Sequence, residues 1–184
     1  MRRITVAISG ASGAIYAIRL LEALREKKVE THLILSEWAY VTIKAETNYL
    51  PEEVKKLASY SYAVKDLTAP LTSGSFLIEG MVIIPCSMKT LAAIACGYAD
   101  NLISRAADIT IKEGRKLILV PRETPLNAIH LENMLKLSRL GVVILPPMPA
   151  FYIKPSTIDD LVNHTIGKVL DQLGIDNNLY RRWK

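Results

Sequence analysis

The sequence predicts an α/β protein with a mainly parallel, six-stranded sheet covered by helices on both faces. Short runs of β-branched and aliphatic residues alternate along the chain with longer segments whose apolar residues recur at helical spacing. Strands that alternate with helices form parallel sheets, because each crossover helix returns across a face of the sheet. The chain has 184 residues, 50% of them hydrophobic, which suits one domain with a substantial core.

The first half of the chain begins with a strand, a glycine-containing turn and a helix. Residues 4–8 are short and β-branched, and apolar residues at helical spacing begin at Ala14. A proline followed by two acidic residues at Pro51 is typical of a helix start. The predicted elements are strands over 4–8, 29–35 and 61–64, helices over 14–26, 37–46 and from Pro51 onward, and a loop over 69–76.

The second half repeats this alternation, and polar residues mark the starts of its helices. Ser87, Asp100 and Thr157 stand where a side-chain oxygen can cap a helix. Gly141 and Gly174 stand where helices commonly end. The predicted elements are strands over 80–85, 116–120 and 142–145 and helices over 88–95, 100–113, 129–140 and 157–173.

Charge and hydropathy exclude several classes of function. The net charge is +5, but outside residues 181–184 no run of Lys and Arg exceeds two residues and no aromatics interleave with a basic stripe, so we expect no nucleic acid partner. No apolar run approaches the ~20 residues that span a bilayer, and the N-terminal strand is too short for a signal peptide. We therefore expect a cytoplasmic protein that binds small anions and has no membrane partner.

The cysteines and histidines indicate neither a disulfide nor a metal site. Cys86 and Cys96 form no C-x-x-C motif, and both are expected to stay reduced. No histidine stands near Cys86 in the sequence, which favours a small buried apolar residue over a nucleophile. The three histidines are isolated and lack metal-ligand spacing, so no metal is predicted.

Ligands of parallel sheets bind at the carboxyl ends of the strands, near the point where the strand order reverses. The turn at 9–13 lies at such an end and has the features of an anion-binding loop, since its glycines let backbone N–H groups approach an anion at a helix start. Its spacing is G-x-x-G, and Ser36 rather than an acid follows the second strand. This favours a mononucleotide over a dinucleotide; a tight turn without a ligand stays open.

The later loops carry further polar groups. The run 85–90 places hydroxyls at a helix start, where they can meet an isoalloxazine edge or a phosphate. Arg122 and Glu123 follow a buried strand and form either an acid/base pair facing a ligand or a surface ion pair. The stiff run 146–152 can wall an apolar pocket or pack between subunits. By themselves, Lys112 and Lys168 are ordinary lysines of a helix surface.

Six segments occur in the order found in one known family. They are Gly10-Ala11-Ser12-Gly13, Pro85-Cys86-Ser87-Met88-Lys89-Thr90-Leu91-Ala92, residues 100–108, Arg122-Glu123-Thr124-Pro125-Leu126, His130-Leu131-Glu132-Asn133-Met134 and residues 146–152. Together with Arg182 and Trp183 at the end of the chain, they resemble the UbiX-type flavin prenyltransferases. The resemblance implies a single FMN-binding domain over residues 1–184 with a three-layer, Rossmann-like flavoprotein fold.

The resemblance also implies an activity and partners. Such an enzyme joins a dimethylallyl group from dimethylallyl phosphate to N5 and C6 of reduced FMN, without a metal. The prenylated FMN then serves a UbiD-type decarboxylase. The enzyme is expected to be a homo-oligomer, a dodecamer, with sites at subunit interfaces.

Carried over position by position, the resemblance assigns roles to residues of this chain. The implied catalytic residues are Ser12, Glu46 and Glu123. The implied FMN-binding residues are Gly10, Ala11, Ser12, Ser36, Ser87, Met88, Lys89, Thr90 and Arg122. The implied ligands of dimethylallyl phosphate are Lys112, Arg122, Tyr152, Lys168 and Trp183. Some relatives have arginine at position 168, and lysine there gives up the bidentate fork of a guanidinium.

Two other functions remain as alternatives. The first is a flavin-dependent cysteine decarboxylase of the same general fold, which needs a histidine after the first helix and a Pro-x-Met-Asn-type signature. This chain has Thr124-Pro125-Leu126-Asn127 at the corresponding stretch and no histidine between Gly13 and Val29. The second is an FMN carrier, for which Glu123 and Lys168 would be dispensable.

Overall fold

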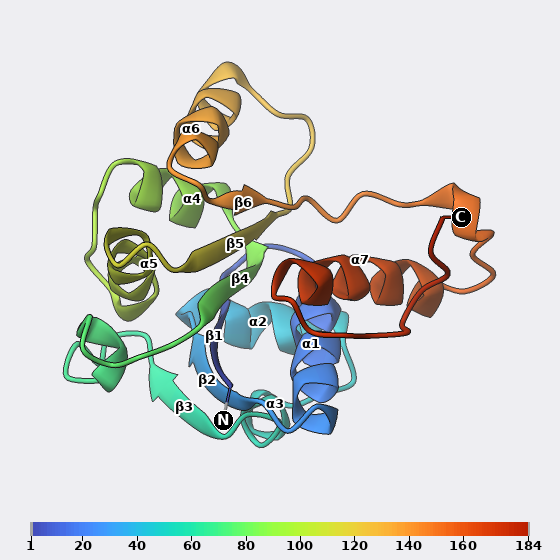
Figure 1. Ribbon diagram of the computed structural model, residues 1–184, viewed down its shortest axis with the longest axis horizontal. Coiled ribbons are helices and arrows are strands. Elements are labelled where there is room, and N and C mark those ends of the chain that lie inside the picture. Colours follow the sequence, from blue (N-terminus) through green and yellow to red (C-terminus); the bar gives the residue numbers. More distant parts are fainter. Residues whose placement is uncertain (1, 184) are drawn as a thin grey trace.

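Six strands form one sheet, and every neighbouring pair of strands is parallel, which confirms the predicted fold class. The strands are β1 (Arg3–Ile8), β2 (Glu30–Leu35), β3 (Tyr60–Ala63), β4 (Gly80–Cys86), β5 (Lys116–Pro121) and β6 (Val143–Ile144). The computed structural model describes residues 2–183, and the strands lie in the order β3-β2-β1-β4-β5-β6 (Figure 1). Residues 1 and 184, the ends of the predicted domain, lie outside the described residues.

Helices cover both faces of this sheet. They are α1 (Ala14–Glu26), α2 (Glu37–Glu46), α3 (Pro51–Lys55), α4 (Met88–Ala95), α5 (Leu102–Lys112), α6 (Ala128–Arg139) and α7 (Ile158–Gln172), with short 3₁₀ turns η1 (Pro70–Thr72) and η2 (Phe151–Ile153). The chain starts at β1 inside the sheet, adds β2 and β3 on one side of it, and then adds β4, β5 and β6 on the other side. The strand order therefore reverses between β1 and β4. Ligands of such sheets bind at this point.

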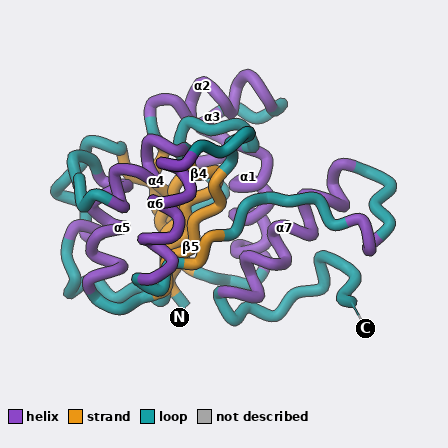
Figure 2. Tube along the Cα trace, turned by 90° about the horizontal axis from the view of Figure 1, so that it is seen from above, coloured by secondary structure: helices purple, strands orange, loops and turns teal. Residues whose placement is uncertain are grey.

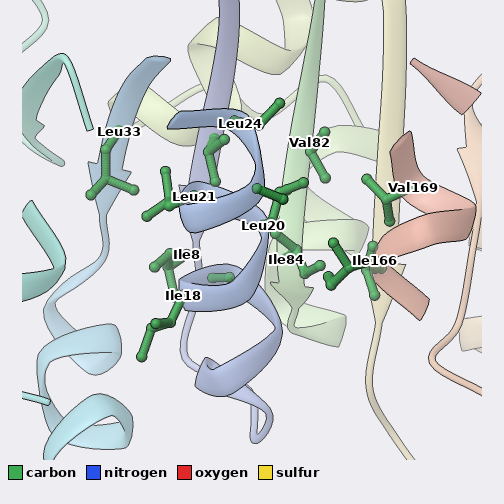
Figure 3. Packing of buried hydrophobic residues seen from close by; sticks show 14 of the residues in the cluster. Ile8, Ile18, Leu20, Leu21, Leu24, Leu33, Val82, Ile84, Ile166 and Val169 are labelled. Atoms are coloured by element: carbon green, nitrogen blue, oxygen red, sulfur yellow. The ribbon is translucent and has the colours of Figure 1, made fainter. Parts of the chain in front are cut away.

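Alternate residues of the strands supply two hydrophobic cores, one on each face. In β4, Val82 and Ile84 pack with residues of α1 and α7, whereas Met81 and Ile83 pack on the opposite face. Figure 3 shows Leu20 of α1 among the residues of the first core. The alternation follows from the two-residue period of a strand, so a continuous apolar run is buried on both sides.

The structure corrects several predicted boundaries. Asn101, not Asp100, caps α5, because its Oδ1 accepts hydrogen bonds from the N–H groups of Ile103 and Ser104. The predicted loop over 69–76 contains η1. The last strand is shorter than predicted. Leu145 still donates to the carbonyl of Leu119, but the prolines that follow have no N–H group and cannot continue the pairing with β5. The caps predicted at Ser87 and Thr157 are confirmed.

The last part of the chain leaves the sheet and returns. Figures 1 and 2 show the segment between β6 and α7 extending away from the sheet, with α7 coming back beside α1 and the tail running along α7. In the tail, Asn177 donates to the carbonyl of Gly167 and to Asp171, and Tyr180 donates to Asp171 at 2.6 Å. These contacts bring residue 183 back toward the extended segment.

Candidate active site

Ser9 links the carboxyl ends of β1 and β4, where the strand order reverses. Its hydroxyl donates to the carbonyl of Pro85 at 2.8 Å and accepts from the N–H of Ser87 at 2.7 Å. The side chain is buried, so each of these bonds is protected from water. Ser9 therefore sets the spacing between two loops that the sequence predicts to bind a ligand, although nothing in the sequence distinguished it within the 9–13 turn.

The anion at the start of α1 is a side chain of the protein itself. Glu46, the last residue of α2, accepts hydrogen bonds at Oε2 from the N–H of Gly13 at 2.7 Å and from the N–H of Ala14 at 3.2 Å. A carboxylate at a helix N-terminus is favoured by the free N–H groups and by the helix dipole. These two N–H groups, which the sequence predicts to bind a phosphate, bind the Glu46 carboxylate in this structure.

Gly10 is fitted against an aromatic side chain that the sequence reasoning missed. A Cβ atom on Gly10 would lie 2.4 Å from Cβ of Trp38, so the loop can pass α2 only where no side chain is present. The indole of Trp38 is 67% exposed beside this glycine. Ser36 begins the same helix and accepts from the N–H of Ala39 at 3.0 Å. In the sequence, the large aromatic residue Trp38, three positions after the second strand, was the signal that could have revealed this contact.

A cavity of about 280 Å³ lies beyond the carboxyl ends of β2 and β4. Its lining combines hydroxyls, an ammonium and the starts of two helices, and includes Ser36, Trp38, Lys89, Thr90, Asn101 and Ser104. Ser87 caps α4 there, accepting from the N–H of Thr90. Helix starts, hydroxyls and a lysine together form a donor set suited to a phosphate group. Three of the residues predicted to bind FMN, namely Ser36, Lys89 and Thr90, line this cavity.

Arg122 and Glu123 follow β5 and lie close to the 9–13 turn. The N–H of Arg122 donates to the carbonyl of Cys86 at 3.2 Å. Burial raises the pKa of Tyr16 on α1, and the positive charge of Arg122 opposes part of that rise. Across residues 2–183, Arg122 and Glu123 form no ion pair with each other, and both side chains are exposed.

Cys86 lies in the same region without a chemical role. The residue is fully buried in the core, and burial raises the pKa of its thiol far above the usual range. A thiol held in this form is a poor nucleophile. The sequence interpretation of Cys86 as a small apolar core residue agrees with its position.

An aromatic cluster, defined as Tyr152, His164, Tyr180 and Trp183, forms a second group of predicted residues. The ring centroids of Tyr152 and Trp183 are 5.4 Å apart with the planes nearly perpendicular. The Tyr152 hydroxyl lies 3.2 Å from Nε2 of His164, and the His164 ring packs on its other side against Tyr180. Lys168, one turn after His164 on α7, is exposed beside the cluster. His164 was not singled out, since a lone histidine carries no sequence signal.

The tail is held to α7 by a charged hydrogen-bond network. Asp171 accepts from the guanidinium of Arg182 at 2.7 Å and from the hydroxyl of Tyr180 at 2.6 Å. The hydrogen bond from Arg182 is the main cause that lowers the pKa of Asp171 to about 2. Burial, followed by the hydrogen bond to Asp171, raises the pKa of Tyr180 to about 12. Gly167 permits the close approach, because a Cβ there would lie 2.3 Å from the Tyr180 ring.

Lys112 is not brought to the other predicted residues within one chain. It ends α5, pairs with the carboxylate of Glu113 and lies next to the amino end of β5, whereas Arg122 follows the carboxyl end of that strand. The length of β5 separates the two positions by about 17 Å, at about 3.3 Å per residue. Because α5 runs antiparallel to the strands, a site shared by Lys112 and Arg122, as predicted, would combine residues of two copies of the chain.

Two further properties concern metals and membranes. Among residues 2–183, no group of three or more His, Cys, Asp and Glu side chains is placed to hold a metal ion. Within the same residues, every helix is too short or too polar to cross a bilayer.

Sequence comparison relates the whole chain to one family. The profile of the family described as Flavoprotein matches residues 1–170. A flavin prenyltransferase, LpdB, of Lactiplantibacillus plantarum is 56% identical, with 100% of this chain and 99% of the relative covered. The mitochondrial flavin prenyltransferase PAD1 of Saccharomyces cerevisiae is 52% identical over 100% of this chain and 76% of its own length.

Solved structures give the same result. A crystal structure of AnUbiX (PadA1) in complex with FMN and dimethylallyl pyrophosphate superposes with a TM-score of 0.98 at 54% identity, covering 100% of this chain and 97% of that one. A dodecameric FMN-dependent UbiX-like protein from Escherichia coli O157:H7 superposes with a TM-score of 0.97 at 55% identity, covering 99% of each chain. The FMN-dependent cysteine decarboxylase TvaF, at 17% identity and a TM-score of 0.68, covering 95% of this chain and 99% of its own, shares the fold alone.

Proposed function

Since this chain belongs to the flavoprotein family and, within it, to the flavin prenyltransferases of the UbiX type, we propose that it transfers a dimethylallyl group from dimethylallyl phosphate to N5 and C6 of reduced FMN. The prenylated FMN then serves a UbiD-type decarboxylase. The observation that carries the proposal is the arrangement where the strand order reverses: Glu46 is bound to the 9–13 turn, and the N–H of Arg122 is bound to Cys86 at the end of β4.

FMN is the acceptor substrate of this reaction, and when bound it supplies the two nucleophilic atoms. The residues proposed to hold it are Gly10, Ala11, Ser12, Ser36, Ser87, Met88, Lys89, Thr90 and Arg122. The cavity at the starts of α4 and α5 supports a phosphate position beside Lys89 and Ser36. Gly10 lets the loop lie directly against Trp38, and the exposed indole of Trp38 stands beside the proposed flavin site.

The donor is proposed to bind between Arg122 and the aromatic cluster. Cleavage of the allylic C–O bond leaves extra negative charge on the phosphate and a cation-like allyl fragment. Arg122, Lys168 and the Tyr152 hydroxyl are proposed to stabilise this charge on the phosphate by electrostatic contacts. The exposed indole of Trp183 can stabilise the allylic cation, and an apolar pocket closed around it would exclude the water that quenches such a cation.

Ser12, Glu46 and Glu123 are the proposed catalytic residues. Glu46 is fixed by two backbone N–H groups beside Ser12, so its carboxylate is already oriented when the substrates bind. Forming a bond to C6 releases a proton, and a fixed carboxylate at this edge can accept it. The Glu123 side chain accepts a hydrogen bond from the N–H of Thr124 in its own loop and is exposed. It is therefore proposed to act as an acid that protonates the departing phosphate.

The proposal places the enzyme in a homo-oligomer. The relative from Escherichia coli is dodecameric, and Lys112 lies at the opposite end of β5 from Arg122. If Lys112 contacts the donor, it comes from a second copy of the chain. We further propose one functional domain over residues 1–184 and a cytoplasmic location, supported by two free cysteines; the yeast relative is mitochondrial.

An anaerobic assay tests the proposal directly. The purified protein is incubated with reduced FMN and either dimethylallyl phosphate or dimethylallyl diphosphate, and the flavin is analysed by mass spectrometry. We expect a flavin heavier by one prenyl unit with at least one donor. Recovery of unmodified FMN with both donors, while FMN binds the protein, would favour the carrier alternative.

A cysteine decarboxylase would behave differently in a parallel assay. Such an enzyme would remove CO₂ from a peptide ending in cysteine with oxidised FMN and no prenyl donor. We expect the peptide mass to stay unchanged. The chain has no histidine between Gly13 and Val29, which supports this expectation.

A further inference from the structure

His164 has no part in the roles described so far, yet it holds the hydroxyl group of Tyr152. Its Nε2 lies 3.2 Å from that oxygen, and the two rings meet edge to face with centroids 5.8 Å apart. On its other side, the imidazole packs against Tyr180 at 4.9 Å between centroids. The imidazole is thus fixed between two aromatic rings, with one nitrogen directed at Tyr152.

We propose that His164 is a positioning residue for the prenyl donor, an inference that rests on the function proposed above. Its Nε2–H donates to the oxygen of Tyr152, so the phenol directs its own hydrogen at the phosphate of the donor. His164 itself need not touch the donor. This role is additional to those of Tyr152 and Lys168.

The hydroxyl group of Tyr152 has a single hydrogen, so it can donate to only one partner at a time. If Nε2 carries no hydrogen, Tyr152 donates to His164 and presents only lone pairs to an approaching anion. If Nε2 carries the hydrogen, Tyr152 accepts from His164 and is free to donate to the phosphate. Hydrogen bonds to a charged acceptor are about twice as strong as neutral ones, so a bound phosphate selects the second arrangement.

The charges around the imidazole couple this arrangement to pH. The groups that face it are Tyr152 from η2, Lys168 from α7 and Tyr180 from the tail, whose hydroxyl is already donated to Asp171. Burial lowers the pKa of His164 below 6.5, and the Lys168 ammonium lowers it further. An anion bound between Tyr152 and Lys168 offsets the charge of the Lys168 ammonium and favours the protonated imidazole. Donor binding should therefore be accompanied by proton uptake at His164 and strengthen as pH falls through its titration.

Two substitutions separate the hydrogen bond from the charge. His164→Leu removes both, whereas His164→Gln keeps an amide N–H that can reach Tyr152 but cannot titrate. His130→Gln is the matched control, because this histidine lies on α6 and glutamine at the third helical position preserves the capping arrangement. For each protein, KM for dimethylallyl phosphate, kcat and FMN affinity are measured from pH 5.5 to 8.

We expect His164→Leu to raise KM for the donor about tenfold at pH 7, the loss expected for a hydrogen bond that supports a charged contact. The FMN affinity and kcat should change less than twofold. His164→Gln should match the wild type at pH 8 and lose the tighter binding that the wild type gains at low pH. The donor phosphate itself titrates at roughly pH 6, so the ratio of variant to wild-type KM is the quantity that reports His164.

Two kinetic results would overturn the inference. One is a KM for His164→Leu within twofold of the wild type at every pH, while Tyr152→Phe raises it. The other is a ratio between His164→Gln and wild type that does not vary with pH, which removes the proton coupling.

A binding measurement separates this inference from the proposed function. The chain has three histidines, so ¹⁵N-labelled imidazoles can be assigned with the two glutamine variants. Adding dimethylallyl phosphate should protonate Nε2 of His164. If Nε2 becomes protonated in a protein that forms no prenylated flavin, the inference holds and the proposed function fails. If the protein is active and Nε2 stays bare, the inference fails alone.

Discussion

At the scale of single residues, the contact between Glu46 and the start of α1 changes the meaning of the 9–13 turn. The turn resembles a phosphate cradle in sequence, but the N–H groups that would bind a phosphate bind Glu46. This carboxylate connects the end of α2 with the start of α1, 33 residues away in the chain. It thereby holds Ser12 and Glu46 in one place, and it moves the expected phosphate position toward α4.

Substitution of Glu46 tests this connection. Glu46→Gln keeps an acceptor oxygen but removes the charge, so we expect a loss of about 0.3–1 kcal/mol in the free energy of unfolding. Glu46→Ala removes the partner of the Gly13 N–H, which water can replace in this exposed contact, and should cost about 0.5–1.5 kcal/mol. Chemical denaturation measures both. Equal stability of the alanine and glutamine variants would show that the contact does not matter in solution.

Glu123 is the residue whose removal should affect chemistry without affecting binding. Glu123→Gln removes an acid/base group, for which we expect single-turnover prenyl transfer to slow by about 10²–10⁴-fold. FMN affinity should stay unchanged, because the side chain is exposed and bonded to its own loop. Rapid-quench mass spectrometry gives the rate, and flavin fluorescence gives the affinity. A full single-turnover rate would remove Glu123 from the catalytic residues.

At the scale of elements, Ser9 holds the ends of β1 and β4 together. Ser9→Ala leaves the N–H of Ser87 without its hydrogen-bond partner in a buried position, so we expect a loss of about 1–3 kcal/mol in stability and weaker FMN binding. Ser61→Ala, on an exposed position of β3, is the matched control and should change stability by less than about 0.5 kcal/mol. Flavin affinity equal to that of the control would contradict the assigned role.

The tail and α7 form an element-scale unit whose stability depends on Asp171. Because the folded-state pKa of Asp171 is lowered from 3.8 to about 2, its contribution is fully present above pH 3.8 and is lost as pH falls toward 2. At neutral pH, Asp171→Asn should therefore loosen the tail while the sheet stays folded. Trypsin should cleave the variant at Arg181 and Arg182 several times faster than the wild type. An unchanged cleavage rate would show that the other tail contacts are sufficient.

Most elements could be predicted from the sequence because their signals are local. The continuous apolar run of β4 and the cap residues Ser87 and Thr157 act within a few residues of themselves. The cap of α5 was misplaced by one residue because Asp100 and Asn101 are both good caps, and only the helix geometry decides between them. The boundary of β6 depended on which carbonyl Leu145 reaches on β5, a contact between distant segments.

The candidate site was predictable only in part, for the same reason. Loops after parallel strands gather at one edge of the sheet, so the turn at 9–13, Ser87 and Arg122 were expected together. The partner of Glu46 and the contact of His164 with Tyr152 depend on how α2 and the tail fold back. The copy of the chain from which Lys112 reaches a site could not be predicted, because the resemblance to a family does not say which copy supplies a residue.

At the scale of the whole molecule, the position of Lys112 makes oligomerisation testable through activity. We expect Lys112→Ala and Glu123→Gln each to impair turnover. If Lys112 acts on a neighbouring copy, co-expressing the two variants gives mixed assemblies in which roughly a quarter of the sites are intact, as random mixing of two chains in a closed oligomer requires. Activity in the mixed preparation is then well above either variant alone.

The control for this experiment is a mixture of the two variants in which no mixed assemblies form. Preparations of the two variants mixed after purification, without exchange of subunits, should show only the average of their separate activities. If the co-expressed preparation also shows only this average, Lys112 either acts within its own chain or takes no part.

The extended segment between β6 and α7 has an evolutionary consequence. The residues proposed to hold the flavin come from the loops of the first five strands, whereas Tyr152, Lys168 and Trp183 come from the part of the chain after the sheet is complete. Apart from Arg122 and Lys112, the residues proposed to recognise the donor are therefore encoded in a separate stretch of sequence from those proposed to recognise the acceptor. Variation after residue 145 can change the size of the prenyl group that is accepted while the machinery for the flavin is inherited intact.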